Sequence, residues 1–264
     1  MKVLVIGSGA REHAIISALL SDDDVSDVVA APGNAGIAQL VATRPVDFTD
    51  PVAVADLAVD VVADLVVVGP EVPLVAGAAD AVRERGIACF GPSAAAAQLE
   101  GSKAFAKQVM AEAGVPTAMA HVCTTIDEVG AALDQFGVPY VVKDDGLAAG
   151  KGVAVTSDRD EAIAHARACL SRGNDAQVVI EEYLDGPEVS LFAITDGVTV
   201  GMVGRLGGFS SGPAANNDRN IIVVGLTATV LTVVPLSGGP LIDAASVAAT
   251  SFTVAGRFCR TGQT

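Results

Sequence analysis

The sequence predicts an α/β fold in which a three-layer domain with a parallel sheet precedes a smaller α+β unit. Two observations lead to this prediction. Over residues 1–92, short apolar runs alternate with segments of helical length, the pattern of a parallel sheet covered by helices. A Gly-Val-Pro break at 114–116 then marks a boundary, and a glycine-rich turn at 145–151 follows between two strand-like runs.

In the first unit, strands and helices alternate with short turns between them. Residues 3–6 are an apolar strand that runs into the turn GSG, and residues 10–20 have the length and apolar spacing of a helix. The same reasoning predicts strands at 27–31, 63–68 and 87–90, and helices at 52–62 and 74–84. Residues 1–92 are therefore expected to form one α/β domain.

The second unit follows a helical connection. Residues 93–113 have helical character, so we expect residues 93–118 to connect the two units. Further predicted elements are strands at 139–143 and 152–156 around the glycine turn, a helix at 158–170 capped by Ser157, and strands at 177–183 and 188–194. Residues 119–200 should thus form a small α+β unit with a glycine-rich flap.

Charge and cysteine content exclude several classes of protein. The 264-residue chain has a formal net charge of −15, which repels the phosphates of nucleic acids. Its four cysteines are far apart without CxxC spacing, so we expect neither disulfides nor a zinc knuckle, and a cytoplasmic location. The apolar run at 221–234 is shorter than the ~20 residues that span a bilayer. No nucleic-acid partner, no membrane partner and no targeting segment is expected.

The glycine turn at 7–9 leaves two interpretations open. A dinucleotide-binding GxGxxG motif would need glycine at position 12, but Glu12 stands there, and its carboxylate would repel a pyrophosphate. This argues against NAD binding. The turn either links strand to helix and nothing more, or its backbone N–H groups bind the phosphate of a smaller ligand.

The glycine loop after residue 143 also leaves two interpretations. A P-loop, GxxxxGK[ST], requires glycine at position 145 and a hydroxyl at position 152, where the chain has Asp145 and Gly152. This excludes a P-loop. The loop is then either a plain hairpin with solvated lysines, or a flap that closes over a polyphosphate while Lys143 and Lys151 neutralise its charge.

A family resemblance decides between these interpretations. The chain resembles phosphoribosylamine–glycine ligases, which are ATP-grasp enzymes of purine synthesis, in six motifs: residues 3–15 (VLVIGSGAREHAI), 32–36 (PGNAG), 69–71 (GPE), 101–107 (GSKAFAK), 142–153 (VKDDGLAAGKGV) and 181–190 (EEYLDGPEVS). The resemblance covers residues 1 to about 200. It implies a substrate-binding, pre-ATP-grasp domain at 1–92 and an incomplete ATP-grasp domain whose small subdomain is 119–200.

The resemblance also implies a reaction. Such ligases use ATP to convert glycine to glycyl phosphate, which the amine of 5-phosphoribosylamine attacks to form an amide. Glycine, 5-phosphoribosylamine and ATP are therefore the expected small-molecule partners of a monomer, with Mg²⁺ or Mn²⁺ as the metal expected for the family.

Site residues are implied in the same way. Lysines and the glycine flap contact the ATP phosphates, the strand edge at 181–184 reads adenine, and an acid at 188 holds the ribose. The residues implied for ATP binding are Lys103, Lys143, Gly146, Ala148, Ala149, Gly150, Lys151, Gly152, Glu181, Glu182, Leu184 and Glu188. Those implied for phosphoribosylamine are Gly9, Arg11, Glu12, Asn34, Gly69, Pro70 and Glu71. Without the resemblance, the charged residues among them would be read as solvated, because charged residues near turns usually are.

One departure lies inside the matched region. The family usually has Lys-Ala-Asp-Gly where this chain reads Lys143-Asp144-Asp145-Gly146. The extra carboxylate of Asp144 would weaken nucleotide binding if it pointed toward the phosphates. Because neighbours in a strand face opposite sides, Asp144 is also able to face away from Lys143.

The composition changes after residue 200. Residues 201–264 lack the family's metal-binding segments and contain two acids, Asp218 and Asp243. Since Mg²⁺ needs carboxylate oxygens near the phosphates, we assign no metal ligand and leave open whether this form of the chain is active or inactive. This tail is either out of frame or divergent. Three functions stay open: the ligase itself, a nucleotide-binding fragment without turnover, and another ATP-grasp carboxylate–amine ligase.

Overall fold

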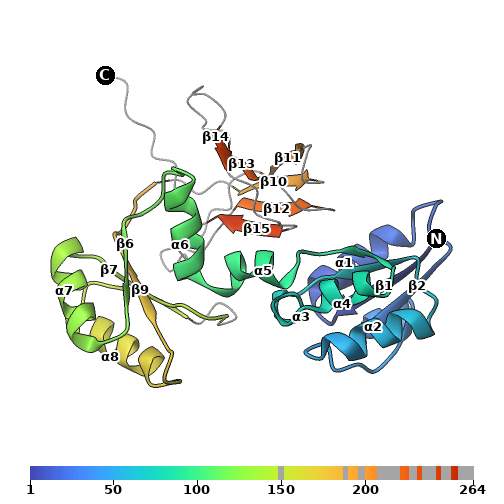
Figure 1. Cartoon of the computed structure of the whole chain (residues 1–264), viewed down its shortest axis with the longest axis horizontal. Helices are drawn as coiled ribbons and strands as arrows, with labels where there is room; N and C mark the ends of the chain where they lie inside the picture. Colours follow the sequence, from blue (N-terminus) through green and yellow to red (C-terminus); the bar gives the residue numbers. More distant parts are fainter. Residues whose placement is uncertain are drawn as a thin grey trace.

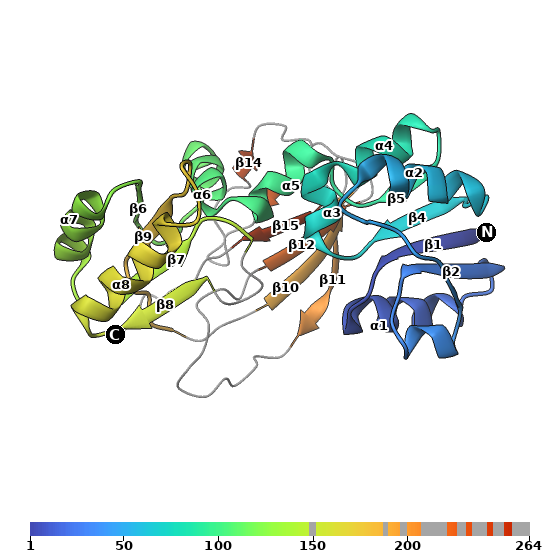
Figure 2. The same ribbon diagram turned by 90° about the horizontal axis from the view of Figure 1, so that it is seen from below.

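The computed structural model describes residues 1–147 and 152–186 with their side chains, and the backbone of six strands between residues 190 and 254. Two α/β units lie toward opposite ends of the long axis, and helices α5 (Ala94–Gly101) and α6 (Lys103–Glu112) run between them (Figure 1). The view from below also shows α5 and α6 between the two units (Figure 2). The predicted α/β class, with a parallel sheet in its first unit, is confirmed.

The N-terminal unit is built on a five-stranded sheet in the order β3-β2-β1-β4-β5, and every strand pair in it is parallel. Its elements are β1 (Lys2–Gly7), α1 (Ala10–Leu19), β2 (Asp27–Pro32), the 3-10 helix η1 (Ile37–Gln39), β3 (Ala42–Thr43), α2 (Pro51–Asp60), β4 (Leu65–Val68), α3 (Glu71–Ala76), α4 (Ala78–Glu84) and β5 (Ala88–Phe90).

Both faces of this sheet are covered. Leu4 and Ile6 of β1 belong to one buried cluster with residues of α2 and α4, whereas Val3 and Val5 pack with Ile16 of α1 on the other side. A strand that is buried on both faces needs apolar residues at successive positions, which explains the unbroken run at the start of the chain. Because these strands are parallel, the turns after β1, β2 and β4 meet at one edge of the sheet.

Two predicted helices are each interrupted in the structure. The predicted helix at 74–84 is wrong as a single element, because Gly77 adopts φ 101° and divides it into α3 and α4. The predicted helical stretch 93–113 is divided at Ser102, which has the extended values φ −139° and ψ 118°. Because Ser102 caps the new helix through its side chain, α6 has an N-terminus of its own.

The second unit contains a four-stranded antiparallel sheet in the order β6-β9-β7-β8. Its elements are β6 (Ala120–Cys123), α7 (Ile126–Phe136), β7 (Tyr140–Asp144), β8 (Val153–Thr156), α8 (Arg159–Leu170) and β9 (Val178–Glu181). The hairpin of β7 and β8 around the glycine turn is confirmed, whereas β6 and α7 were not predicted. The N-cap of α8 is Asp158 and not the predicted Ser157, because the Asp158 carboxylate accepts from two backbone N–H groups of the first turn.

The remaining strands form two more sheets. One has the order β11-β10-β12-β15 and the other pairs β13 with β14. These strands are β10 (Ser190–Thr195), β11 (Val200–Leu206), β12 (Ile221–Gly225), β13 (Leu231–Val233), β14 (Ile242–Ala244) and β15 (Ser251–Val254). Within the part of the chain that is described, no helix is both long and apolar enough to cross a membrane.

Candidate nucleotide and substrate site

The sheet of the second unit has one face for its core and one face for charged side chains. Val142 and Ile180 pack into the cluster that includes residues of α7 and α8. Lys143 of β7 and Glu181 of β9 point to the opposite face, because successive residues in a strand face opposite sides. The register places Lys143 opposite Val179 and Val141 opposite Glu181, so Lys143 and Glu181 are diagonal neighbours.

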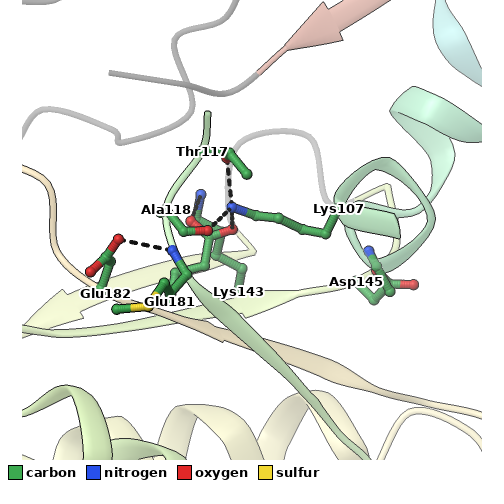
Figure 3. Close-up of polar contacts among 9 residues, drawn as sticks. Lys107, Thr117, Ala118, Lys143, Asp145, Glu181 and Glu182 are labelled. Carbon is green, nitrogen blue, oxygen red and sulfur yellow. Dashed lines mark hydrogen bonds and ion pairs between the residues drawn. The ribbon is translucent and has the colours of Figure 1, made fainter. Parts of the chain in front are cut away.

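Glu181 holds two ammonium groups. Its Oε2 lies 2.9 Å from Lys143 Nζ and its Oε1 lies 3.3 Å from Lys107 Nζ. The exposed fractions of the three side chains are 3% for Lys143, 7% for Glu181 and 11% for Lys107. We call these three residues the lysine–glutamate cluster; Figure 3 shows Lys107 reaching from α6 toward the two strands.

The lysine–glutamate cluster brings two ammonium groups together around one carboxylate. Glu182 also acts on Lys107 from nearby, and burial leaves little water to screen these charges. Burial lowers the pKa of Lys107 from its ordinary value, while the Glu181 carboxylate acts in the opposite direction. Such a cluster favours an anion beside it, which fits the phosphates of a nucleotide.

Lys107 was not among the predicted site residues. It donates to Thr117 Oγ1 at 2.9 Å and to the Ala118 carbonyl at 2.8 Å, in addition to its ion pair with Glu181 (Figure 3). It therefore ties α6 to the segment that enters β6. The spacing carried a usable signal, because Lys103 and Lys107 are four residues apart and share one face of a helix.

The segment after β9 is paired with the segment before β6. The Glu182 carboxylate accepts from Met119 N at 2.9 Å, and Glu182 N donates to the Met119 carbonyl at 3.0 Å. Leu184 is half-buried. The side chain of Glu181 points into the lysine–glutamate cluster. Glu182 instead contacts Met119, so the two neighbouring acids have different partners.

Lys103 lies at the base of the glycine flap. Its Nζ donates to the Gly146 carbonyl at 3.3 Å. Gly146 is exposed and Gly152 is buried, and the Gly152 carbonyl accepts from Asp144 N at 2.6 Å. Five residues implied for ATP binding lie outside the described residues: Ala148, Ala149, Gly150, Lys151 and Glu188.

The extra carboxylate of Asp144 faces away from Lys143. It pairs with Arg172, which follows α8, and so lies on the helix-covered side of the sheet. The substitution that departs from the usual family pattern therefore places no charge on the face that carries the lysine–glutamate cluster.

In the N-terminal unit, Glu12 lies beneath the glycine turns. Its side chain is 3% exposed, and its Oε2 accepts from Gly9 N at 2.6 Å. A Cβ atom at Gly69 would lie 2.1 Å from Glu12 Oε1, and one at Gly7 would lie 2.6 Å from Glu12 Cγ. The turns after β1 and β4 are therefore glycine because the Glu12 side chain fills the space beside them.

Other residues implied for phosphoribosylamine binding surround the same sheet edge. Arg11 NH1 donates to Glu71 Oε1 at 2.8 Å, and α3 begins at Glu71 immediately after Pro70. Asn34 Nδ2 donates to the Ser8 carbonyl at 2.7 Å, while its Oδ1 accepts from Gly36 N and Ile37 N. The turns after β1, β2 and β4 are thus linked, with the charged tips of Arg11 and Glu71 at the surface.

A bound metal ion would need several ligating side chains close together. Across residues 1–147 and 152–186, no group of three or more His, Cys, Asp or Glu side chains is arranged to hold a metal. No catalytic step is therefore assigned to a metal bound by these residues.

The α/β domain followed by an antiparallel sheet with a glycine hairpin and buried lysines belongs to the ATP-grasp class, whose domain model matches the second half of this arrangement. The fold is shared with the biotin carboxylase domain of a Hydrogenobacter thermophilus 2-oxoglutarate carboxylase, at 21% identity and a TM-score of 0.60 over 77% of this chain and 49% of that one. Within this class, the family model "Phosphoribosylglycinamide synthetase, N domain" matches residues 1–100, and the model for the ATP-grasp (A) domain matches residues 101–232. The chain belongs to the phosphoribosylglycinamide synthetase family.

Individual relatives agree with the family match. The phosphoribosylamine–glycine ligase of Streptomyces coelicolor is 64% identical over 200 residues, which are 76% of this chain and 47% of the relative. That of Mycobacterium tuberculosis is 58% identical over 205 residues, or 76% of this chain and 48% of the relative. The crystal structure of the Thermotoga maritima enzyme has a TM-score of 0.63 at 30% identity, over 78% of this chain and 49% of that one.

The chain spans about half the length of the curated relatives it matches. The match to the ATP-grasp domain model extends to residue 232, beyond the position near 200 where we expected the resemblance to end.

Proposed function

We propose that the protein is an ATP-dependent ligase that joins glycine to 5-phosphoribosylamine, and that this chain supplies the lysines that bind ATP. The lysine–glutamate cluster carries the proposal: it lies within the ATP-grasp match and places two ammonium groups beside a glycine hairpin. The names of the relatives support the substrates.

The proposed reaction has two steps. A carboxylate oxygen of glycine attacks the γ-phosphorus of ATP, so that the bond to the β-phosphate breaks and ADP leaves. The amine of 5-phosphoribosylamine then attacks the carbonyl carbon of glycyl phosphate, phosphate leaves, and the nitrogen loses a proton. The first step shifts negative charge among phosphoryl oxygens, and the second builds it on the carbonyl oxygen and on the leaving phosphate, so the protein contributes mainly by orienting the reactants and neutralising this charge.

Roles for individual residues follow from this proposal. Lys103 and Lys143 would bind phosphates, while residues 146–152 would close over them and exclude water. The segment 181–184 would bind adenine and Glu188 the ribose. At the N-terminal sheet edge, Arg11, Asn34 and Glu71 would face phosphoribosylamine, with the turns at Gly9, Gly69 and Pro70. Glu12 would hold the Gly9 turn in place from below, because its carboxylate is buried.

Further parts of the proposal concern domains, metal and setting. Residues 1–92 would bind substrate, 93–118 connect, and 119–200 bind the nucleotide. Mg²⁺ or Mn²⁺ would accompany ATP, as expected for the family. The protein would act as a monomer. A reducing cytoplasm fits the free and buried state of Cys89, Cys123 and Cys169.

A second candidate function is ATP binding without turnover. It is favoured by the lack of a metal-binding group of acids in the described residues. Two measurements separate the candidates. Calorimetric titration of the chain with MgATP should give binding in both cases, and Lys143→Met should abolish it. Only the ligase should release phosphate in a manner that needs both glycine and 5-phosphoribosylamine.

Each outcome has a defined meaning. Absence of ATP binding by the wild-type chain would contradict both functions. Binding with no substrate-dependent phosphate release would favour the nucleotide-binding fragment. Release with a different carboxylic acid, identified from the amide product, would indicate another ATP-grasp carboxylate–amine ligase.

A further inference from the structure

Asp145 joins three segments that are far apart in the sequence. Its side chain is buried, with 8% exposed, and both of its oxygens are used. Oδ1 accepts from Ala104 N at 2.6 Å, and Oδ2 accepts from Ser102 Oγ and Gln177 Nε2, each at 2.9 Å. Its backbone takes part as well, since Lys103 N donates to the Asp145 carbonyl at 3.3 Å and Asp145 N donates to the Gln177 carbonyl at 3.2 Å.

These contacts complete the N-terminus of α6. The first N–H groups of a helix have no partner within the helix. Here Lys103 N and Ala104 N bind Asp145, and Phe105 N binds Ser102 Oγ at 3.0 Å. A carboxylate also suits the partial positive charge at this end of a helix. Asp145 thus caps α6 from a position more than forty residues away in the chain.

Asp145 is connected to two lysines of the candidate site, to Lys143 along the chain and to Lys103 by a hydrogen bond. Asp145 follows Lys143 by two positions, where β7 ends and the glycine flap begins. Lys103 is the first residue of the helix that Asp145 caps, and its Nζ reaches the carbonyl of Gly146, the residue after Asp145. Movement of α6 relative to β7 would therefore change the separation of the Lys103 and Lys143 ammonium groups.

We propose that Asp145 is a positioning residue: it holds the N-terminus of α6, and with it Lys103, against the strand that carries Lys143 and the base of the flap. This inference rests on the proposed function, because it assigns these two lysines to one nucleotide. Asp145 does not touch the nucleotide in this role. It acts through Ala104, Ser102 and Gln177.

The direction in which the Kd for MgATP changes when the Asp145 charge is removed distinguishes a positioning role from a direct electrostatic effect. Removing a carboxylate near a polyphosphate reduces repulsion and should strengthen binding if Asp145 acted through its charge alone. Loss of positioning should instead weaken binding. Asp145→Asn keeps the shape but removes the charge that suits the N-terminus of α6, and its N–H₂ group replaces one accepting oxygen, so either the contact to Gln177 Nε2 or the one to Ala104 N is lost.

The neighbouring residue provides a matched control. Asp144 is buried to the same degree, with 7% exposed, but its carboxylate faces Arg172 on the other side of the sheet. Asp144→Asn removes the same charge from the adjacent position, the last residue of β7, without touching α6.

The experiment measures the Kd for MgATP of the full chain by calorimetry, together with hydrogen exchange of the amides of residues 103–106. We expect Asp145→Asn to raise the Kd at least tenfold and to accelerate exchange at these amides. Asp144→Asn should leave the Kd within twofold of the wild-type value and the exchange unchanged. A Kd for Asp145→Asn that is unchanged or lower, or an equal rise in both variants, would overturn the inference.

A second variant covers a failure of Asp145→Asn to fold. Gln177→Leu removes one donor to Asp145 and leaves α6 untouched; we expect a rise in Kd of about threefold, and no rise would overturn the inference. If the wild-type chain binds no ATP, the proposed function fails, and the exchange data then decide the positioning role independently. Faster exchange at residues 103–106 in Asp145→Asn than in Asp144→Asn would support it, and equal exchange would overturn it.

Discussion

Lys143 and Glu181 form a buried ion pair in which Nζ and Oε2 are 2.9 Å apart on adjacent strands. Because Glu181 also binds Lys107, this carboxylate is the counter-charge for both ammonium groups. Removing one partner of a buried pair is costly, since the remaining charge loses both its water and its partner.

Glu181→Gln should therefore destabilise the chain by about 3 kcal/mol, measured as the change in the free energy of unfolding in urea. Glu182→Gln is the matched control, because its amide oxygen is still able to accept from Met119 N. We expect that variant to lose less than about 1 kcal/mol. Equal losses in the two variants would show that the lysine–glutamate cluster contributes no more than an ordinary hydrogen bond.

Gly69→Ala should destabilise the N-terminal unit by about 2 kcal/mol or more, because the new methyl group would overlap Glu12 Oε1. In a Glu12→Ala background the obstructing side chain is gone, so the same change should cost much less. Gly173→Ala is the control, since a Cβ atom there would meet no atom within 4 Å. Thermal unfolding of the four variants of this double-mutant cycle measures the coupling. Additive losses would contradict the steric explanation.

Arg172→Ala should destabilise the chain by about 1 kcal/mol, because it leaves the Asp144 carboxylate, with 10% of its side chain exposed, without its cation. Arg159→Ala is the comparison. Its partner Asp134 is 67% exposed and remains solvated, so we expect a loss below about 0.5 kcal/mol in urea unfolding. Losses in the reverse order would show that burial of Asp144 is not the cause.

Cys89 and Cys123 should resist alkylation in the native chain. Burial raises the pKa of each thiol to about 11, so at pH 8 only about one molecule in a thousand carries the reactive thiolate. Iodoacetamide labelling, read from the peptides that contain each cysteine, should be slow at pH 8 and fast once urea unfolds the chain. It should accelerate as the pH rises toward 11. Equal rates in native and unfolded protein would refute this prediction.

Local pattern was sufficient for much of the fold. The apolar run that forms β1 predicts a strand covered on both faces, and residues 145–151 predict a turn between two strands. Periodicity was insufficient at Ser102, because the alanine-rich segment before it and the segment after it both favour helix. The break there depends on Asp145, which binds the new N-terminus from another part of the chain.

The candidate site was likewise predictable from the sequence in part. The sequence by itself determined which residue types stand in order along the chain: the lysines at 103 and 143, the glycine turns and the acids beside them. Only the tertiary structure decided their partners. Asp144 and Asp145 are adjacent and chemically identical, yet one pairs with Arg172 and the other caps α6. The physical reason is that a strand directs successive side chains to opposite faces, and what each meets there depends on how distant segments pack.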